Sequence, residues 1–192
     1  TIGIPRGLMN YYQMFPFWHS LFTSLGFDIV LSSPTGRETV TESLEIMMAE
    51  TCLPVEVIHG HVSDLLKKNV DHIFLPFVVN SAPLDGSNPT NNCNCPWVQA
   101  HPYLIKAAFR AKAITEKLLI PSLHFRYRHV YPKELEKFFS SKFGISPALM
   151  GKAIEKAWEA QNGFERNIRL TGSNILADLD KYRLCVVLLG RP

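Results

Sequence analysis

The sequence predicts an α/β fold: a Rossmann-like, open and mainly parallel sheet flanked by helices, with a helical insertion before the last strand. Three observations predict it. Short apolar runs alternate with segments of helical periodicity through the first half of the chain, a long helical stretch follows, and a last apolar run closes the sequence. With 192 residues, 46% of them hydrophobic, the chain is long enough for one large domain or two small ones.

The first half has the β-α-β-α-α-β order that is typical of a parallel sheet. Gly26 ends the first predicted helix, and Pro54 begins the third. The predicted elements are, in order, a strand over 2–5, a helix over 11–25, a strand over 27–31, helices over 39–49 and 54–68, and a strand over 70–77.

The second half begins with a polar loop and ends in a strand. The predicted elements are a loop over 80–94, a short strand over 97–100, a helix over 102–112, a strand within 118–124, a helical stretch over 132–182 and a last strand over 183–189. We expect Cys185, inside this last strand, to pack in the core. Gly190 follows the strand as a turn, and a natural chain rarely ends as a turn begins, so we expect a fragment of a longer polypeptide.

This pattern predicts three parts. Residues 1–130 form a Rossmann-like α/β domain that carries Cys52 and Cys95, residues 131–182 form a helical segment, and residues 183–192 form a strand that leads into a further domain outside this sequence.

Composition and charge exclude several classes of protein. The net charge of +3 comes without a basic tail, so we expect no nucleic-acid partner. No apolar run approaches the roughly 18 residues of a membrane span, and the N-terminus lacks the features of a signal peptide, so we expect no membrane and a cytoplasmic location. The glycine loops of nucleotide-binding proteins, the G-x-S-x-G motif of hydrolases and the H-E-x-x-H motif of metalloproteases are also missing.

Three cysteines form the candidate metal site. Pro54 predicts that Cys52 lies at the start of a helix, where unpaired N–H groups and the helix dipole favour a thiolate. Cys93 and Cys95 lie at the end of a polar loop after a strand, at the edge of the sheet that Cys52 can also face. In a reducing cytoplasm such soft thiolates suit an iron–sulfur cluster, zinc or copper, although the C-x-C spacing does not match a simple zinc finger. The alternative is that these cysteines are small residues packed at loop ends.

Four further polar residues are candidates near that edge. Arg6 follows the first strand, where a guanidinium either holds an anion such as phosphate or carboxylate or is paired within the fold. His59 and His61 flank Gly60 and point to different faces of their helix, so they cannot easily share one metal ion. One of them can face the site, and the alternative is that they cap or pack within the fold. His101 lies at a predicted helix start, where a capping role competes with a role as a ligand.

Several blocks of the sequence resemble a known family. They include Ile2-Gly3-Ile4-Pro5-Arg6-Gly7-Leu8, Cys52-Leu53-Pro54, His59-Gly60-His61 and Asn94-Cys95-Pro96, in this order. With them the chain resembles the conserved domain found downstream of the ATPase module in large activases related to the activator of 2-hydroxyglutaryl-CoA dehydratase, the CoA-substrate-specific enzyme activases. That domain is itself similar to the iron–sulfur subunits of 2-hydroxyacyl-CoA dehydratases, and the resemblance covers nearly all of the chain.

The resemblance implies stacked Rossmann-like domains whose cysteines meet at an iron–sulfur cluster, and low-potential electron transfer in anaerobes. Cys52 and Cys95 match the two motif cysteines, whereas Cys93 is an additional cysteine to which the family assigns no role. A [4Fe–4S] cluster normally needs more than two thiolates. Further ligands would therefore come from Cys93, from residues beyond Pro192 or from a partner, and the cluster would be incomplete or absent in this chain alone.

The resemblance implies an iron–sulfur-binding electron-transfer domain of an activase or reductase system for 2-hydroxyacyl-CoA dehydratase-type enzymes. His59, His61 or His101 would lie beside the cluster as a hydrogen-bond donor. The partners would be the ATPase module of the same full-length protein, where ATP hydrolysis would take place, and an acyl-CoA dehydratase-type enzyme, and a homodimer stays open. One alternative is a non-catalytic docking domain of the same activase with no bound cluster and inert cysteines, and another is a domain that uses Arg6 to bind CoA or phosphate.

Overall fold

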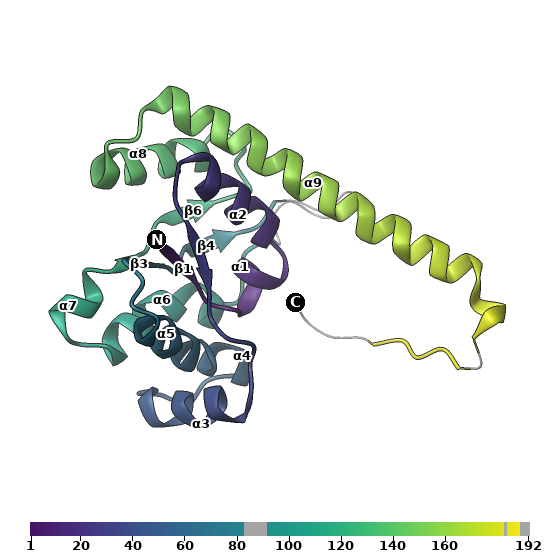
Figure 1. Cartoon of the computed structure of the whole chain (residues 1–192), viewed down its shortest axis with the longest axis horizontal. Helices are drawn as coiled ribbons and strands as arrows, with labels where there is room; N and C mark the ends of the chain where they lie inside the picture. The colour runs from purple at the N-terminus through teal and green to yellow at the C-terminus, as the bar shows by residue number, and fades with distance from the viewer. Residues whose placement is uncertain (83–91, 183, 189–192) are drawn as a thin grey trace.

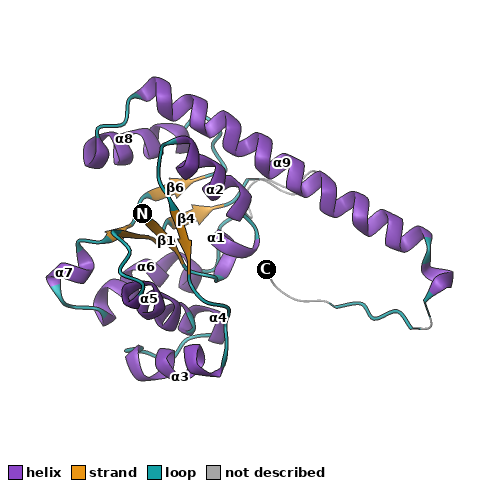
Figure 2. Ribbon diagram, in the orientation of Figure 1, coloured by secondary structure: helices purple, strands orange, loops and turns teal. Residues whose placement is uncertain are grey.

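The structure, a computed structural model, describes residues 1–82, 92–182 and 184–188 (Figure 1). Its centre is a parallel sheet of four strands in the order β2-β1-β3-β5, namely β1 (Ile2–Ile4), β2 (Ile29–Leu31), β3 (His72–Phe74) and β5 (Leu118–Leu119). A further parallel pair joins β4 (Phe77–Asn80) to β6 (Ser122–His124). Helices flank the strands on both sides (Figure 2), so the predicted α/β class with a parallel sheet is confirmed.

Two prolines divide strands that the sequence predicted as single. Pro76 separates β3 from β4, and Pro121 separates β5 from β6. A proline has no N–H to donate to the sheet ladder, so regular pairing is interrupted at each position. The two segments nevertheless stay side by side across the break, since the Phe77 N–H donates to the Pro121 carbonyl at 2.9 Å.

The helices cover both faces of the sheet. They are α1 (Leu8–Tyr12), α2 (Phe15–Ser24), α3 (Arg37–Ile46), α4 (Leu53–Glu56), α5 (Ile58–Lys67), α6 (Pro96–Ala108), α7 (Lys112–Thr115), α8 (Tyr131–Phe143) and α9 (Pro147–Ala177), followed by a short 3-10 helix, η2 (Leu179–Lys181). The predicted helices over 11–25 and 54–68 are thus each interrupted once. Among the described residues, none of the helices has the length and apolar character needed to cross a membrane.

Two apolar clusters, one on each face of the sheet, hold the layers together. The first lies between the strands and α2, α8 and α9. Its largest buried side chains are Phe17, Trp18, Phe22, Phe74 and Phe139. The second lies between the sheet, α5 and α6, and its members include Ile58, Val62, Leu65, Ile73 and Ile105. Each such side chain contributes about 1.5–3 kcal/mol when it is removed from water, so these clusters dominate the stability of the fold.

The strand predicted over 97–100 is wrong, because these residues form the first turns of α6. Pro96 occupies the beginning of that helix, where the N–H has no helical partner in any case. The helix then continues through Pro102, which the prediction placed at a helix start. A short apolar run alone does not distinguish a strand from a buried helix.

The last predicted strand is also wrong over the residues that the structure describes. Residues 184–188 have no regular secondary structure, and Leu188 is 91% exposed. Cys185, which was expected in the core, is exposed. The physical reason is visible in Figure 1: α9 carries this segment away from the sheet that it would have to join.

Some predicted features lie outside the described residues. They are residues 83–91 of the polar loop, and residue 183 and residues 189–192 of the last strand. The predicted continuation into a further domain stays a prediction.

α3 approaches α5 closely at Gly60. A Cβ atom at this position would overlap the carbonyl oxygen of Thr39 and would lie 2.6 Å from the Ser43 hydroxyl oxygen. The Gly60 N–H donates to that hydroxyl at 2.9 Å, and the hydroxyl donates to the Thr39 carbonyl at 2.7 Å. The missing side chain therefore lets the two helices exchange hydrogen bonds.

We expect Gly60→Ala to lower the free energy of unfolding by about 1–3 kcal/mol, because α3 must move to make room for the added methyl group. Gly151→Ala is the matched control, since Gly151 lies in α9, is exposed, and has open space where a Cβ would be placed. This control should gain up to about 1 kcal/mol from helix propensity. Urea unfolding followed by circular dichroism measures both variants, and effects of the same sign and size would contradict the packing explanation.

Candidate functional site

The cysteine-bearing helices begin at the same edge of the sheet. α4 runs into α5, which leads to β3, and α6 leads through α7 to β5. Because β3 and β5 are parallel neighbours, the helices that precede them run back along the sheet and begin at its carboxyl edge. α4 also contacts α6, so the two helix starts belong to one region of the molecule.

Cys52 and Cys95 occupy the same position in their helices. Cys52 is the N-cap residue of α4, Cys95 is the N-cap residue of α6, and a proline follows within two residues of each. The predicted helix start at Cys52 is confirmed, whereas the one at Cys95 was missed, although Pro96 was an available signal. Neither cysteine side chain makes a capping hydrogen bond, and both thiols are free and exposed. The cap side chains therefore leave first-turn N–H groups unengaged, although in α4 the Val55 N–H donates to the Cys52 backbone carbonyl at 2.8 Å. A negative charge at such a helix start would be stabilised.

Asn94 holds the loop that carries Cys93 and Cys95. Its side-chain amide donates to the Val78 carbonyl at 2.9 Å, and its side-chain oxygen accepts the Ser81 hydroxyl at 3.0 Å. No role for Asn94 was predicted from the sequence. Its place between the two cysteines in a polar loop was the available signal, since asparagine commonly fixes loops through side-chain-to-backbone hydrogen bonds.

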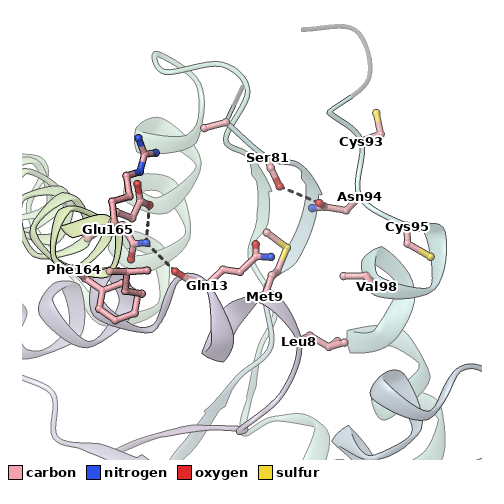
Figure 3. Close-up of a pocket in the computed structure, with 14 residues that line it drawn as sticks. Leu8, Met9, Gln13, Ser81, Cys93, Asn94, Cys95, Val98, Phe164 and Glu165 are labelled. Atoms are coloured by element: carbon pink, nitrogen blue, oxygen red, sulfur yellow. Dashed lines mark hydrogen bonds between the residues drawn. The ribbon is translucent and has the colours of Figure 1, made fainter. Parts of the chain in front are cut away.

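A cleft of about 640 Å³ adjoins this loop (Figure 3). Its walls are α1, the loop after β4, the beginning of α6 and part of α9, and Cys93 and Cys95 both line it. Cys52 does not line it, so the structure brings two of the three candidate cysteines together and places the third outside the cleft. Within the described ranges, 1–82, 92–182 and 184–188, no group of three or more His, Cys, Asp or Glu side chains is arranged to hold a metal ion.

Arg6 is paired within the fold. Its Nε–H donates to the Ser32 carbonyl at 2.6 Å, and an Nη1–H donates to the Tyr11 hydroxyl at 2.6 Å. The guanidinium carbon also lies 5.3 Å from the centre of the Tyr11 ring, within the range of a cation–π interaction. These contacts join the end of β1 to α1 and to the loop after β2. A role of Arg6 toward an anion stays a prediction.

The chain turns sharply between β1 and α1. A Cβ at Gly7 would overlap the end of the Ile58 side chain of α5, so a larger residue there would require that side chain to move. The next residue, Leu8, has a φ of 53°, a left-handed conformation that is unfavourable for a bulky side chain. Leu8 lines the cleft beside Cys95, and this strained turn is what brings α1 to the cleft wall.

His61 ties the ends of β1 and β2 to α5. Its Nδ1 lies 2.9 Å from the Ser32 hydroxyl, and its Nε2 lies 3.0 Å from the Thr35 hydroxyl. The same Ser32 hydroxyl accepts the backbone N–H of Arg6 at 2.8 Å. Burial lowers the pKa of His61, so its ring is neutral at pH 7, and both ring nitrogens are engaged within the fold.

His101 supplies a helix hydrogen bond that Pro102 cannot make. In a regular α-helix the Val98 carbonyl accepts the N–H of residue 102, and proline has none. The His101 Nδ1–H donates to this carbonyl instead, at 2.7 Å, which explains how α6 continues through a proline. Burial lowers the pKa of His101 to about 4, so the ring is neutral at pH 7 and its proton lies on Nδ1, facing the carbonyl.

His59 has the equivalent role in α5. The Glu56 carbonyl would accept the Gly60 N–H in a regular helix, but this N–H donates to the Ser43 hydroxyl of α3. The His59 Nδ1–H donates to the Glu56 carbonyl in its place, at 2.9 Å. Burial lowers the pKa of His59. Both rings are buried, and they lie on α5 and α6, two helices that contact each other.

All three predicted histidines therefore take part in the fold. His61 uses both ring nitrogens there, while His59 and His101 each use Nδ1. In a neutral ring with its proton on Nδ1, the Nε2 atom offers a lone pair and not an N–H. Their expected role as hydrogen-bond donors to a cluster stays a prediction.

The chain matches a family model over its whole length. The matching family is described as a CoA enzyme activase uncharacterised domain, and the match covers residues 1–192. A search of curated proteins and a search of solved structures gave no match.

The hydrogen bond at Pro102 can be tested by a double-mutant cycle. His101→Leu should lower the free energy of unfolding by about 1–3 kcal/mol, because it leaves the part-buried Val98 carbonyl without this donor. Pro102→Ala, added to that variant, supplies a backbone N–H and should recover about 1 kcal/mol or more, whereas Pro102→Ala alone should gain less. Urea unfolding of the four proteins measures the coupling, and an equal effect of Pro102→Ala in both backgrounds would contradict the exchange of donors.

The buried His101 ring should also make the protein sensitive to acid. Its pKa is about 4 in the folded protein, against an ordinary value of 6.5. The unfolded state binds a proton that the folded state excludes, so stability falls as the pH drops from about 6.5 towards 4, by on the order of 3 kcal/mol in all. The His101→Leu, Pro102→Ala protein should lose this part of the dependence. Unfolding free energies between pH 8 and pH 4 measure the difference, and identical slopes in the two proteins would refute it.

Proposed function

Because this chain belongs to the family described as a CoA enzyme activase uncharacterised domain, we propose that it is an iron–sulfur-binding electron-transfer domain of an activase system. The system would serve enzymes of the 2-hydroxyacyl-CoA dehydratase type. The observation that carries the proposal is the shared position of Cys52 and Cys95, each at the N-cap of one of two helices that contact each other and begin at the carboxyl edge of the sheet.

Helix starts favour this chemistry. Thiolates and iron–sulfur clusters are negatively charged, and the free N–H groups of a first turn, together with the positive end of the helix dipole, stabilise negative charge. Hydrogen bonds from such N–H groups to sulfur also raise or lower a reduction potential. A bound cluster would take up and release single electrons, and the contribution of this chain would be to hold two thiolates at fixed helix ends.

The donor set of this chain fits part of such a cluster. Thiolates are its usual ligands, but a four-iron cluster normally needs more of them than Cys52 and Cys95 supply. Cys93, which lines the cleft with Cys95, is the candidate for a third. Since the described residues contain no assembled group of three candidate ligands, we propose that the remaining ligands come from elsewhere in the protein or from a partner. The exposure of all three thiols leaves them accessible for that purpose.

The surrounding residues would fix the positions of the sulfur atoms. Asn94 anchors the loop of Cys93 and Cys95 to the strand backbone, and His59 and His101 complete the hydrogen bonding of α5 and α6. Rigid support of this kind matters because ligand positions must be held to about 0.5 Å. An ATPase module and an acyl-CoA dehydratase-type enzyme would be the partners, the first driving electrons towards the second.

A docking domain without a cluster is the second candidate function. Two observations favour it: Arg6 and the histidines are used within the fold, and Cys52 lies outside the cleft that Cys93 and Cys95 line. The thiols would then remain reduced, and the domain would join the ATPase module to its target enzyme without carrying electrons.

Iron and acid-labile sulfide separate the two functions. They are measured, with a visible spectrum, on the natural protein that contains this chain, prepared without oxygen. We expect stoichiometric iron, and a loss of most of it in the Cys52→Ala, Cys95→Ala variant. Cys185→Ala is the matched control, because Cys185 is also a free and exposed thiol but follows α9, and it should keep the iron.

Any other result would contradict part of the proposal. Iron that persists in the double variant would remove Cys52 and Cys95 from the ligand set. Absence of iron after anaerobic reconstitution would refute electron transfer and leave the docking domain. A Cys93→Ala variant, measured separately, should lose iron if Cys93 is the third thiolate, and an unchanged iron content would exclude it.

A further inference from the structure

The cleft described above continues along α9 beyond the cysteines. A second cavity, of about 350 Å³, shares Ser81, Gln161 and Arg169 with the cleft, and a third, of about 330 Å³, shares Phe125 and Trp158 with the second. Both volumes lie within the range of about 300–1,000 Å³ that is usual for small-molecule sites. We call these two further cavities together the trough, and its principal lining residues are Phe125, Arg128, Tyr131, Trp158 and Arg169.

The trough lies at the edge of the sheet where α/β folds bind ligands. Ala82 comes shortly after the end of β4, Phe125 directly follows β6, and both residues line the trough. Because β4 and β6 are parallel, these residues lie beyond the carboxyl ends of two neighbouring strands. Open parallel sheets hold their ligands in this position, between the loops that leave the strands.

Three aromatic side chains form one wall of the trough. The ring centre of Phe125 lies 4.9 Å from that of Tyr131 and 6.4 Å from that of Trp158. The Trp158 Nε1–H donates to the Tyr131 hydroxyl at 2.6 Å, which fixes the orientation of both rings. Trp158 is only half-buried, so part of its surface is left for a ligand. A planar ring can stack on such a wall.

The Tyr131 hydroxyl has a proton to donate. Tyr131 is buried, and the one hydrogen bond of its hydroxyl within the described residues is the one that it accepts from Trp158. Burial also raises the pKa of Tyr131, so the hydroxyl keeps its proton at pH 7. A buried donor without an acceptor is unfavourable, and an oxygen or ring nitrogen of a ligand would satisfy it.

Two arginines give the trough a positive charge. Arg128, in the loop after β6, and Arg169, on α9, line the same cavity. Within the described residues neither guanidinium forms an ion pair. Glu165 is the acidic residue among the described lining residues, and its Oε1 accepts the Gln161 amide at 3.0 Å (Figure 3). Two arginines and one carboxylate leave a net charge of +1, which favours an anion.

We propose that the trough binds a small molecule that joins a planar ring to a phosphate group, as a nucleotide does. The ring would pack on the aromatic wall at Trp158, and the phosphates would lie between Arg128 and Arg169. A guanidinium forms paired hydrogen bonds with phosphate oxygens, and a phosphate has enough oxygens to engage two arginines at once. Trp158 and Arg169 are separated along α9 by roughly 16 Å, which leaves room for both parts of the ligand.

This site does not depend on a metal cluster. It adjoins the cleft that Cys93 and Cys95 line, but the lining of the trough contains no cysteine among the described residues. Its occupation can therefore be measured separately from the iron content.

Titration calorimetry with ADP, without magnesium, tests the site in the 192-residue chain. One ADP should bind per chain. Arg128→Ala and Arg169→Ala should each weaken binding by about tenfold or more, because charge-assisted hydrogen bonds to phosphate are lost. Arg166→Ala is the matched control, since Arg166 is exposed on the same helix but is not a lining residue of the trough. It should bind ADP within about twofold of the wild type, because salt screens an exposed distant charge.

Partial ligands test the two halves of the site. Adenosine and pyrophosphate should each bind more weakly than ADP. Trp158→Leu should weaken ADP binding by about fivefold or more through lost stacking, and its unchanged binding of pyrophosphate would show that the variant is folded. Coenzyme A carries the same adenine and diphosphate groups, so tighter binding of coenzyme A than of ADP would identify a CoA compound as the natural ligand, and the reverse order a free nucleotide.

Three results would overturn the proposal. Absence of binding of both ADP and coenzyme A at millimolar concentration would show that the trough is not a nucleotide site. Equal losses in Arg166→Ala and in the two lining variants would reduce the effect to general electrostatic attraction. Pyrophosphate that binds as tightly as ADP would remove the ring and the aromatic wall from the site.

Discussion

The close approach of α3 to α5 at Gly60 is the constraint on which the arrangement of the site helices depends. Because residue 60 has no side chain, Ser43 reaches its N–H and redirects the hydrogen bonds of the helix. The Glu56 carbonyl then takes its donor from His59, while His61, on another face of α5, holds the ends of two strands. The histidines of the His-Gly-His segment were expected as hydrogen-bond donors near a cluster, and the contacts described here explain them as partners of the backbone and of hydroxyl groups where α5 meets α3 and the strand ends.

The helices that follow Cys52 (α4 and α5) and Cys95 (α6) are built in the same way. Gly60 and Pro102 each remove a backbone donor about two turns after the cysteine, and a buried histidine next to each supplies the missing hydrogen bond. Both rings are buried, and α5 contacts α6, so the irregular parts of both helices lie in the interior. A pair of helices fixed in this way holds its two starts at a constant separation, which is what a ligand shared between Cys52 and Cys95 would require.

The order of strands and helices in the first half was predictable, since buried parallel strands read as short apolar runs between helical segments. The beginning of α6 was not predictable, because an internal proline such as Pro102 argues against a helix. The helix continues only because the His101 ring is oriented to replace the missing N–H, and that orientation depends on packing. The prediction of the last strand was wrong for a related reason, since an apolar run such as 184–188 becomes a strand only beside another strand. At the site, Pro54 was enough to predict the helix start at Cys52, whereas its position outside the cleft depends on the whole fold.

α9 also sets a length scale. With a rise of 1.5 Å per residue, its 31 residues span roughly 46 Å, and its first half, which packs on α2 and α8, fixes the direction in which the second half leaves the body. Adding or deleting a single residue in the second half would rotate the far end of the helix by about 100° and shift it by about 1.5 Å relative to the sheet. A change of about seven residues, two full turns, would nearly restore the original facing. The length of α9 therefore fixes both the distance of its far end from the sheet and the direction in which that end faces.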